Sequence, residues 1–137
     1  MQFLCLAYYD EKKFDALTRD ELDGLVAQCK AHDEALRQGG RMTMIASLAA
    51  PATSRSIRPR NGRPTITDGP YAEAKECLGS FFIIEAADLD EATAEASKHP
   101  AARMGETLGW GIEVRPIEVC RAHQRLDAEA ALAPSAG

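Results

Sequence analysis

The sequence predicts a ferredoxin-like α+β fold, in which one antiparallel sheet carries two helices on one of its faces. Two β-α-β patterns, at about residues 2–49 and 78–119, flank a central β-hairpin pattern. Two such units whose halves pair antiparallel give this fold. In addition, three predicted strands are apolar on both sides, which is typical of strands buried on both faces. We therefore expect the face of the sheet without helices to be covered as well.

The first β-α-β unit begins with a strand at 2–9, which is aromatic-rich and too short for a stable isolated helix. Thr18 and Glu21 then form a capping box, which predicts that a helix begins here. Gly39-Gly40 ends this helix, and residues 41–49 form the second strand. Between these limits the helix carries an apolar stripe at helical spacing, formed by Leu22, Leu25, Val26, Cys29 and Leu36.

The central segment predicts a projecting β-hairpin, because Asn61-Gly62 is typical of a type I′ turn. Neither proline beside the turn would donate its missing N–H to its partner, so the tip is expected to be a bare two-stranded ribbon. The turn fixes the cross-strand pairs, which are Arg60 with Arg63, Pro59 with Pro64, and Ile57 with Ile66. The ribbon is basic, either as a partner-binding surface or to prevent edge-to-edge pairing, through Arg55, Arg58, Arg60 and Arg63.

The second β-α-β unit begins with a strand at 78–86. Asp88 and Glu91 repeat the capping pattern and predict a helix that ends near His99-Pro100. At this helix end, His99 is interpreted either as a cation that suits the helix dipole or as a catalytic group. A last strand follows at 111–119.

These elements define one predicted domain at residues 1–119. Residues 120–137 are predicted to be a C-terminal tail that is partly disordered, because the segment ends rich in Ala, Pro and Ser. A chain of 137 residues fits one domain and can bury a core without disulfides.

Composition excludes several classes of function. The formal net charge of −5 argues against nucleic-acid binding and against an anionic membrane surface as partner. The apolar start has no preceding basic residue and no small-residue cleavage site, so we expect no signal peptide, and no apolar run is long enough to span a bilayer. The four cysteines are widely spaced, which favours reduced thiols in a cytoplasmic protein. No Gly-rich phosphate loop or metal-ligand spacing occurs, so we expect neither cofactor nor metal.

The apolar character of both sheet faces predicts a homodimer. If the second face were open to water, it would form a larger apolar patch than monomers usually expose. A second copy packed sheet to sheet about a two-fold axis would cover it. The alternative is that further segments of the same chain cover this face.

A nine-residue motif stands between the hairpin and the strand at 78–86. It is Asp-Gly-Pro-Tyr-Ala-Glu-Ala-Lys-Glu, residues 68–76. The motif resembles the Asp-Gly-Pro-Phe-Ala-Glu-Thr-Lys-Glu signature of one branch of the YCII-related domain family, with Tyr71 in place of Phe and Ala74 in place of Thr. The similarity extends over roughly residues 1–119, including Gly39-Gly40, Asn61-Gly62 and the ending Glu-Val-Arg-Pro. It implies a dimeric α+β barrel, and little about activity. Another branch is thought to use a His/Asp pair in a pocket, and Cys29 stands where that His would lie.

The candidate catalytic residues are Asp68 and His32. His32 lies one turn from Cys29 on the first long helix, where a semi-buried imidazole near a carboxylate could act as a general base. It could equally be a packed histidine with satisfied nitrogens. Asp68 could serve chemistry or accept only local backbone N–H groups.

The candidate ligand-binding residues are Tyr71, Glu73 and Lys75, since loops held by a rigid sheet often form sites. The alternative is that the signature only anchors the entry to the next strand.

Two functions follow from these observations. The first is a small-molecule-binding homodimeric module with a regulatory role, because a pocket-forming fold occurs without a recognisable catalytic set. The second is a cofactor-free enzyme that carries out acid/base chemistry on a small carbonyl or cyclic compound, by analogy of fold.

Overall fold

Four antiparallel strands form the main sheet in the order β2-β5-β1-β6. The structure is a computed structural model, and it describes residues 1–121. The strand bounds are β1 Gln2–Asp10, β2 Met42–Ser47, β5 Glu76–Glu85 and β6 Gly111–Pro116. This strand order and the positions of the helices between the strands confirm the predicted ferredoxin-like α+β fold. Most of the predicted tail, from residue 122 on, lies outside the described residues.

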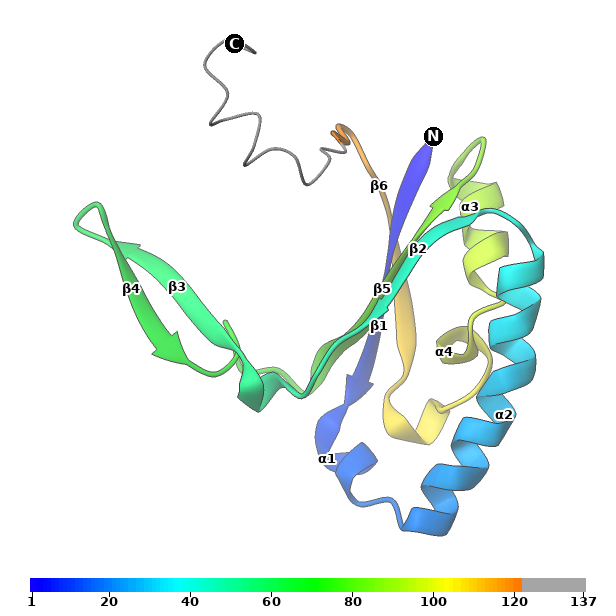
Figure 1. Cartoon of the computed structure of the whole chain (residues 1–137), viewed down its shortest axis with the longest axis horizontal. Helices are drawn as coiled ribbons and strands as arrows, with labels where there is room; N and C mark the ends of the chain where they lie inside the picture. The colour runs from blue at the N-terminus through cyan, green and yellow to red at the C-terminus, as the bar shows by residue number, and fades with distance from the viewer. Residues whose placement is uncertain (122–137) are drawn as a thin grey trace, which may run out of the picture.

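The helices cover one face of this sheet, as Figure 1 shows for α2, α3 and α4. Their bounds are α1 Glu11–Asp15, α2 Arg19–Gln38, α3 Leu89–Ala96 and α4 Pro100–Arg103. Two single 3-10 turns complete the connections, η1 Pro51–Thr53 and η2 Glu106–Leu108. None of the helices within residues 1–121 is both long and apolar enough to cross a membrane.

The hydrophobic core lies between the helices and the sheet. Alternate residues of β1 and β5 point into it, so that Phe3 and Cys5 pack with Phe82 and Ile84. Leu36 is the one fully buried side chain of α2 among the described residues. The remaining core residues are the small side chains Ala86, Ala92 and Ala96. Small residues on α3 let that helix approach the sheet closely.

Local capping patterns set the beginnings of both long helices. Thr18 and Glu21 exchange the two hydrogen bonds of a capping box, at 3.1 and 3.0 Å. Asp88 accepts from the Glu91 N–H at 2.8 Å, and Glu91 accepts from the Ala87 N–H. Both predicted helix starts are therefore confirmed. The short helix α1 was not expected; its five residues follow the N-cap Asp10, whose side chain accepts a hydrogen bond from the Lys13 N–H.

The hairpin forms a separate two-stranded sheet that projects away from the main sheet (Figure 1). We call residues 55–68 the arm; it comprises β3 Arg55–Arg60 and β4 Arg63–Asp68. Asn61 and Gly62 both have positive φ, 52° and 75°, as a type I′ turn requires. The predicted register is confirmed pair by pair, including Ile57 opposite Ile66.

The face of the main sheet away from the helices is largely apolar and carries no helix. We call it the open face; it is formed by Leu4, Leu6, Met44, Phe81 and Ile83. Met44 is 54% exposed and the other four are half-buried. The expectation that residues 41–49 form a strand buried on both faces is wrong for a single chain, because Met44 and Ile45, on opposite faces of β2, are 54% and 47% exposed.

Candidate ligand-binding site

Two adjoining cavities lie between α2 and the sheet, with volumes of about 620 and 350 Å³. The larger cavity lies between the C-terminal half of α2 and β2. The smaller cavity extends toward α1 and the end of β1 and has aromatic walls. Both cavities share four lining residues, which are Asp33, Ser47, Ser80 and His99. The shared residues make this region one continuous candidate site, of a size typical for small ligands.

His99 is held at the centre of this site by three features of its surroundings. Its Nδ1 accepts a hydrogen bond from the Ala101 N–H at 3.0 Å, so that His99 caps the N-terminus of α4. Its ring stacks on Phe82 with the centroids 4.9 Å apart. Because the side chain is buried, its pKa is lowered to about 4. The interpretation of His99 as a cation at a helix C-terminus is therefore wrong.

The hydrogen bond to Nδ1 determines what His99 can do. A neutral imidazole whose Nδ1 accepts a hydrogen bond must carry its own proton on Nε2. This Nε2–H makes no hydrogen bond with residues 1–121, and the His99 side chain, 8% exposed, lines both cavities. His99 therefore supplies a fixed, uncharged hydrogen-bond donor to the site. Such a donor can polarise a carbonyl oxygen but is poorly suited to accept a proton at Nε2.

Asp33 and Cys29 lie one turn apart on α2 and line the smaller cavity. Partial desolvation raises the pKa of Asp33, and the nearby charge of His32 opposes this shift. Desolvation, with the negative charge of Asp33, raises the pKa of Cys29. The thiol therefore stays protonated at neutral pH, with Sγ 3.9 Å from Sδ of Met104. Asp33 can accept a hydrogen bond or a proton in the site, whereas Cys29 contributes apolar surface.

Two aromatic side chains form walls of the smaller cavity, and a glycine makes room for each. A Cβ at Gly79 would lie 2.8 Å from the Tyr9 ring, and one at Gly105 would lie 2.2 Å from the Trp110 ring. Tyr9 also packs edge-on against Phe14, with centroids 5.6 Å apart. Burial and the neighbouring thiol of Cys77 raise the pKa of Tyr9 to about 12, so its phenol is neutral. The walls are flat and uncharged.

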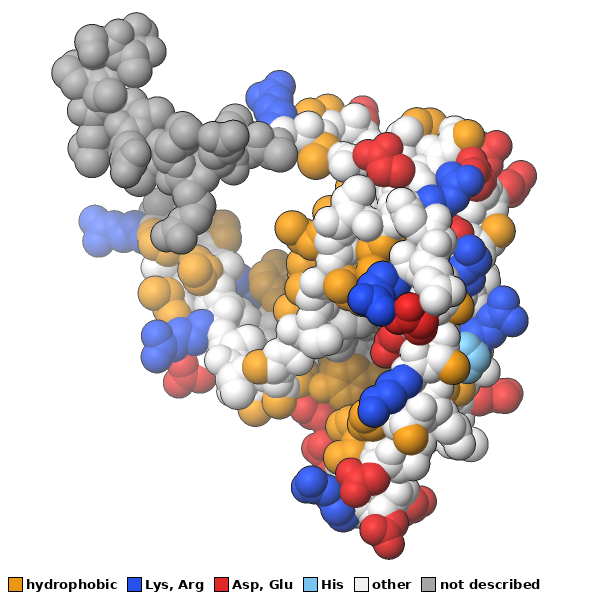
Figure 2. Space-filling view, turned by 45° about the vertical axis from the view of Figure 1, so that its right-hand side comes forward, with side chains coloured by type: hydrophobic (Ala, Val, Ile, Leu, Met, Phe, Trp, Pro, Cys, Tyr) orange, Lys and Arg blue, Asp and Glu red, His pale blue; other side chains and the backbone are white. Residues whose placement is uncertain are grey.

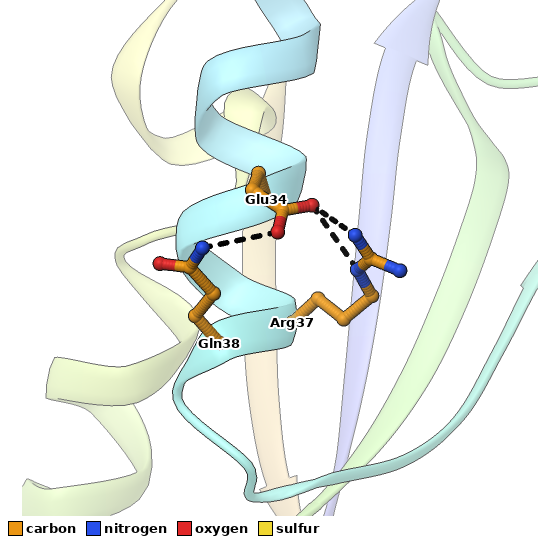
Figure 3. Close-up of polar contacts among 3 residues, drawn as sticks. All are labelled: Glu34, Arg37 and Gln38. Carbon is orange, nitrogen blue, oxygen red and sulfur yellow. Dashed lines mark hydrogen bonds and ion pairs between the residues drawn. The ribbon is translucent and has the colours of Figure 1, made fainter.

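The rim of the larger cavity carries a charged cluster on α2, shown in Figure 3. Glu34 accepts hydrogen bonds from Nε of Arg37 and from Nε2 of Gln38, both at 3.1 Å. The bond from Arg37 lowers the pKa of Glu34. Because the guanidinium of Arg37 already binds this carboxylate, it is not available as a free cation for an anionic ligand.

Asp68 and the signature residues lie on the arm and the loop that follows it, away from the cavities. The Asp68 side chain is 91% exposed and pairs with Arg55 at 3.4 Å. Tyr71 is 65% exposed, with Cζ of Arg58 4.0 Å from its ring centroid. Nη2 of Arg58 also donates to the Tyr71 carbonyl at 2.9 Å. These contacts hold the signature segment against β3.

The remaining predicted site residues also lie outside the cavities. Glu73 and Lys75 are exposed and form no ion pair with residues 1–121. His32 lies on α2, half-buried, and lines neither cavity. Within one chain the structure does not bring His32 and Asp68 together, since α2 and the arm lie on opposite sides of the main sheet (Figure 1).

Sequence reasoning missed Asp33 as a site residue, and it considered a catalytic role for His99 only as the alternative to a capping cation. The apolar stripe and the resemblance pointed to the surroundings of Cys29, and Asp33 lies one helical turn beyond it. That spacing was a usable signal for Asp33. The position of His99 beside α2 depends on the packing of α4 under the sheet, which no local pattern reveals.

Comparisons with known proteins identify relatives of the chain. Residues 1–118 match the model of the YCII-related domain. An uncharacterised protein of Rhizobium meliloti (strain 1021) is 30% identical over 92 residues, which cover 67% of this chain and 74% of that protein. A solved structure, the 5-chloro-2-hydroxyhydroquinone dehydrochlorinase of Burkholderia phenoliruptrix AC1100 in complex with 2,5-dihydroxybenzoquinone, is 16% identical with a TM-score of 0.43, covering 86% of this chain and 94% of that one. The chain belongs to the YCII-related domain family.

Proposed function

We propose that this YCII-related protein binds a small, uncharged molecule in the cavities beside α2, as a homodimeric module with a regulatory role. The observation that carries the proposal is the Nε2–H of His99, which makes no hydrogen bond with residues 1–121 and belongs to a side chain that lines both cavities. A ligand carbonyl or hydroxyl in the cavities can accept a hydrogen bond from this donor, which contributes about 0.5–1.5 kcal/mol.

The lining of the smaller cavity favours a flat and neutral ligand. Its walls include Tyr9, Phe14 and Trp110, and no lysine or arginine lines it. Ser47 and Ser80 add hydroxyl groups, and Asp33 adds an acceptor for a ligand hydroxyl. A small aromatic or cyclic compound that carries both a carbonyl and a hydroxyl group fits this set of partners. A phosphate ester does not fit the smaller cavity, because no cation among the described residues lines it; the lysine of the site, Lys30, lines the larger cavity.

The test is a thermal-shift titration with 4-hydroxybenzaldehyde, cyclohexanone and benzoate as probes. A ligand that binds only the folded state raises the unfolding temperature. We expect the neutral carbonyl probes to stabilise the wild type and benzoate to do so less. His99→Asn keeps an acceptor for the Ala101 N–H but lacks Nε2–H. The apparent dissociation constant of the carbonyl probes, obtained from the titration, should therefore rise at least tenfold. Asp68→Ala, far from the cavities, is the matched control. Equal shifts in wild type and His99→Asn would reject this site.

An acid/base enzyme is the second candidate function, and the pair of Asp33 and His99 favours it. The raised pKa of Asp33 makes it a stronger base than an ordinary carboxylate, and His99 could polarise the carbonyl whose α-proton is removed. The test is deuterium exchange at the α-carbon of cyclohexanone, followed by NMR. Wild type should accelerate exchange and Asp33→Asn should not. If cyclohexanone binds but neither protein changes its exchange rate, proton abstraction by Asp33 is rejected.

The homodimer is part of the same proposal, with the two sheets packed face to face as in a dimeric α+β barrel. The apolar open face supports it, because Leu6, Phe81 and Ile83 would otherwise contact water. The signature at residues 68–76 supports assignment to the branch of the family that carries it. A reducing, cytoplasmic location is proposed on the four cysteines, which are all free.

A further inference from the structure

The arm has two chemically different faces. Its register places Ile57 and Ile66 opposite each other on one face, beside Pro59 and Pro64. The other face carries arginine and threonine side chains, with Thr65 opposite Arg58. Ile57 and Ile66 are 62% and 63% exposed, so the apolar face has no cover within the described chain.

The arm is nevertheless held firmly at its base. The Gly69 N–H donates to the Ser54 carbonyl at 2.8 Å, and Oγ of the buried Ser56 donates to the Gly69 carbonyl at 2.8 Å. Arg58 clamps Tyr71 through its ring and its carbonyl. An isolated two-stranded ribbon is only marginally stable in water. A ribbon that is anchored and apolar on one side is preorganised for a partner surface.

We propose that the apolar face of the arm docks on a second copy of this chain, across the homodimer interface proposed above. The arm extends from the main sheet on the side of the open face, opposite the helices (Figure 1). Figure 2 shows hydrophobic side chains on the arm and on the flank of the body turned toward it, with open space between. Two copies related by a two-fold axis would each receive the other's arm in this space.

Charge favours the same occupant. Four arginines and Asp68 give the arm a formal net charge of +3, and the whole chain carries −5, so the rest of the chain carries −8. The basic arm and the acidic body of a second copy therefore attract each other. Nucleic acid is a poorer occupant, because it would also meet the acidic body.

The experiment measures the dimer dissociation constant of the full chain by sedimentation velocity. The test variant is Ile57→Glu with Ile66→Glu, on the apolar face. The control is Thr65→Glu with Thr67→Glu, on the opposite face of the same ribbon. Both pairs change the arm's charge equally, so only the test variant also removes apolar contact. All four positions are exposed, and circular dichroism checks that each variant folds.

We expect the test variant to raise the dissociation constant on the order of 100-fold, since two large side chains lose their cover, and the control to raise it less than tenfold. Equal effects of the two pairs would overturn docking through the apolar face. A wild-type dimer that neither pair weakens would overturn the role of the arm and leave the sheet-to-sheet dimer intact. A wild-type monomer at 50 µM would reject both proposals, with the arm then open to a different partner.

Discussion

His99 shows how a single residue connects folding and binding in this protein. Its neutral ring caps α4, stacks on Phe82 and leaves Nε2–H for the site. The cap requires the uncharged form of the ring, because a protonated Nδ1 cannot accept a hydrogen bond from the Ala101 N–H. In the unfolded chain the same imidazole would titrate near 6.5, whereas in the folded protein its pKa is about 4. Folding and protonation of His99 therefore oppose each other.

The first prediction is a loss of stability between pH 6.5 and pH 4. In this window the unfolded chain binds a proton at His99 and the folded chain does not. The contribution of His99 to the free energy of unfolding is therefore fully present above pH 6.5 and is lost as the pH falls toward 4. The shift corresponds to about 3 kcal/mol. Urea unfolding at a series of pH values measures this slope. His99→Asn should be less stable at pH 7 but lose less on acidification. Parallel profiles for the two proteins would contradict this assignment.

Gly105 is the second residue whose role can be measured. Its φ is 73°, and a Cβ there would lie 2.2 Å from the Trp110 ring. Gly105→Ala should therefore lower the free energy of unfolding by about 2–4 kcal/mol through backbone strain and displacement of the ring. Gly24→Ala is the matched control, because Gly24 lies within α2 with nothing near its Cβ position. That change should stabilise the helix by about 0.5–1 kcal/mol. Denaturant unfolding of both variants checks the contrast.

Sequence reasoning succeeded with elements whose geometry is set by their own residues. The capping box at Thr18 and the type I′ turn at Asn61-Gly62 depend on neighbours within four positions, and both were predicted. The pairing of β3 with β4 followed from the turn. The site could not be predicted in the same way. Asp33 and His99 are 66 positions apart in the sequence, and only tertiary packing brings both to the lining of the same cavities.

Arg58 of the arm contacts both the ring and the carbonyl of Tyr71 and so acts as a clamp on the signature segment. Removing Arg58 should loosen it, because the Arg58–Tyr71 contacts combine a cation–π interaction of about 0.5–1 kcal/mol with a hydrogen bond. We expect Arg58→Ala to speed exchange of the Gly69 amide roughly threefold to tenfold, with global stability unchanged within about 0.5 kcal/mol. Arg60→Ala removes an equal charge near the turn and should leave that amide unaffected. Amide hydrogen exchange followed by mass spectrometry measures both. Identical exchange in the two variants would show that Arg58 is not the clamp.

At the scale of the whole molecule, the helices bury one face of the sheet and leave the other uncovered. The apolar residues on both sides of β1 and β5 predicted from the sequence that the second face of the sheet would be apolar. They could not predict which surface covers it. Within the described residues, neither a helix nor the arm lies over the open face (Figure 1). The sheet must therefore meet another surface or tolerate contact with water.

The last prediction places a charge at the centre of the open face. Leu6 lies on β1, one of the two inner strands of the sheet, opposite Phe81 of β5, the other inner strand. In a sheet-to-sheet dimer, Leu6→Glu would bury an unpaired carboxylate, which costs several kcal/mol. The variant should therefore be monomeric at concentrations at which wild type is dimeric, as measured by light scattering after gel filtration. Leu89→Glu is the control: Leu89 begins α3 on the helix side, is 47% exposed, and occupies a helix N-terminus, where a negative charge is favourable. It should remain dimeric. If Leu6→Glu is folded and still dimeric, the two-fold contact does not use the open face.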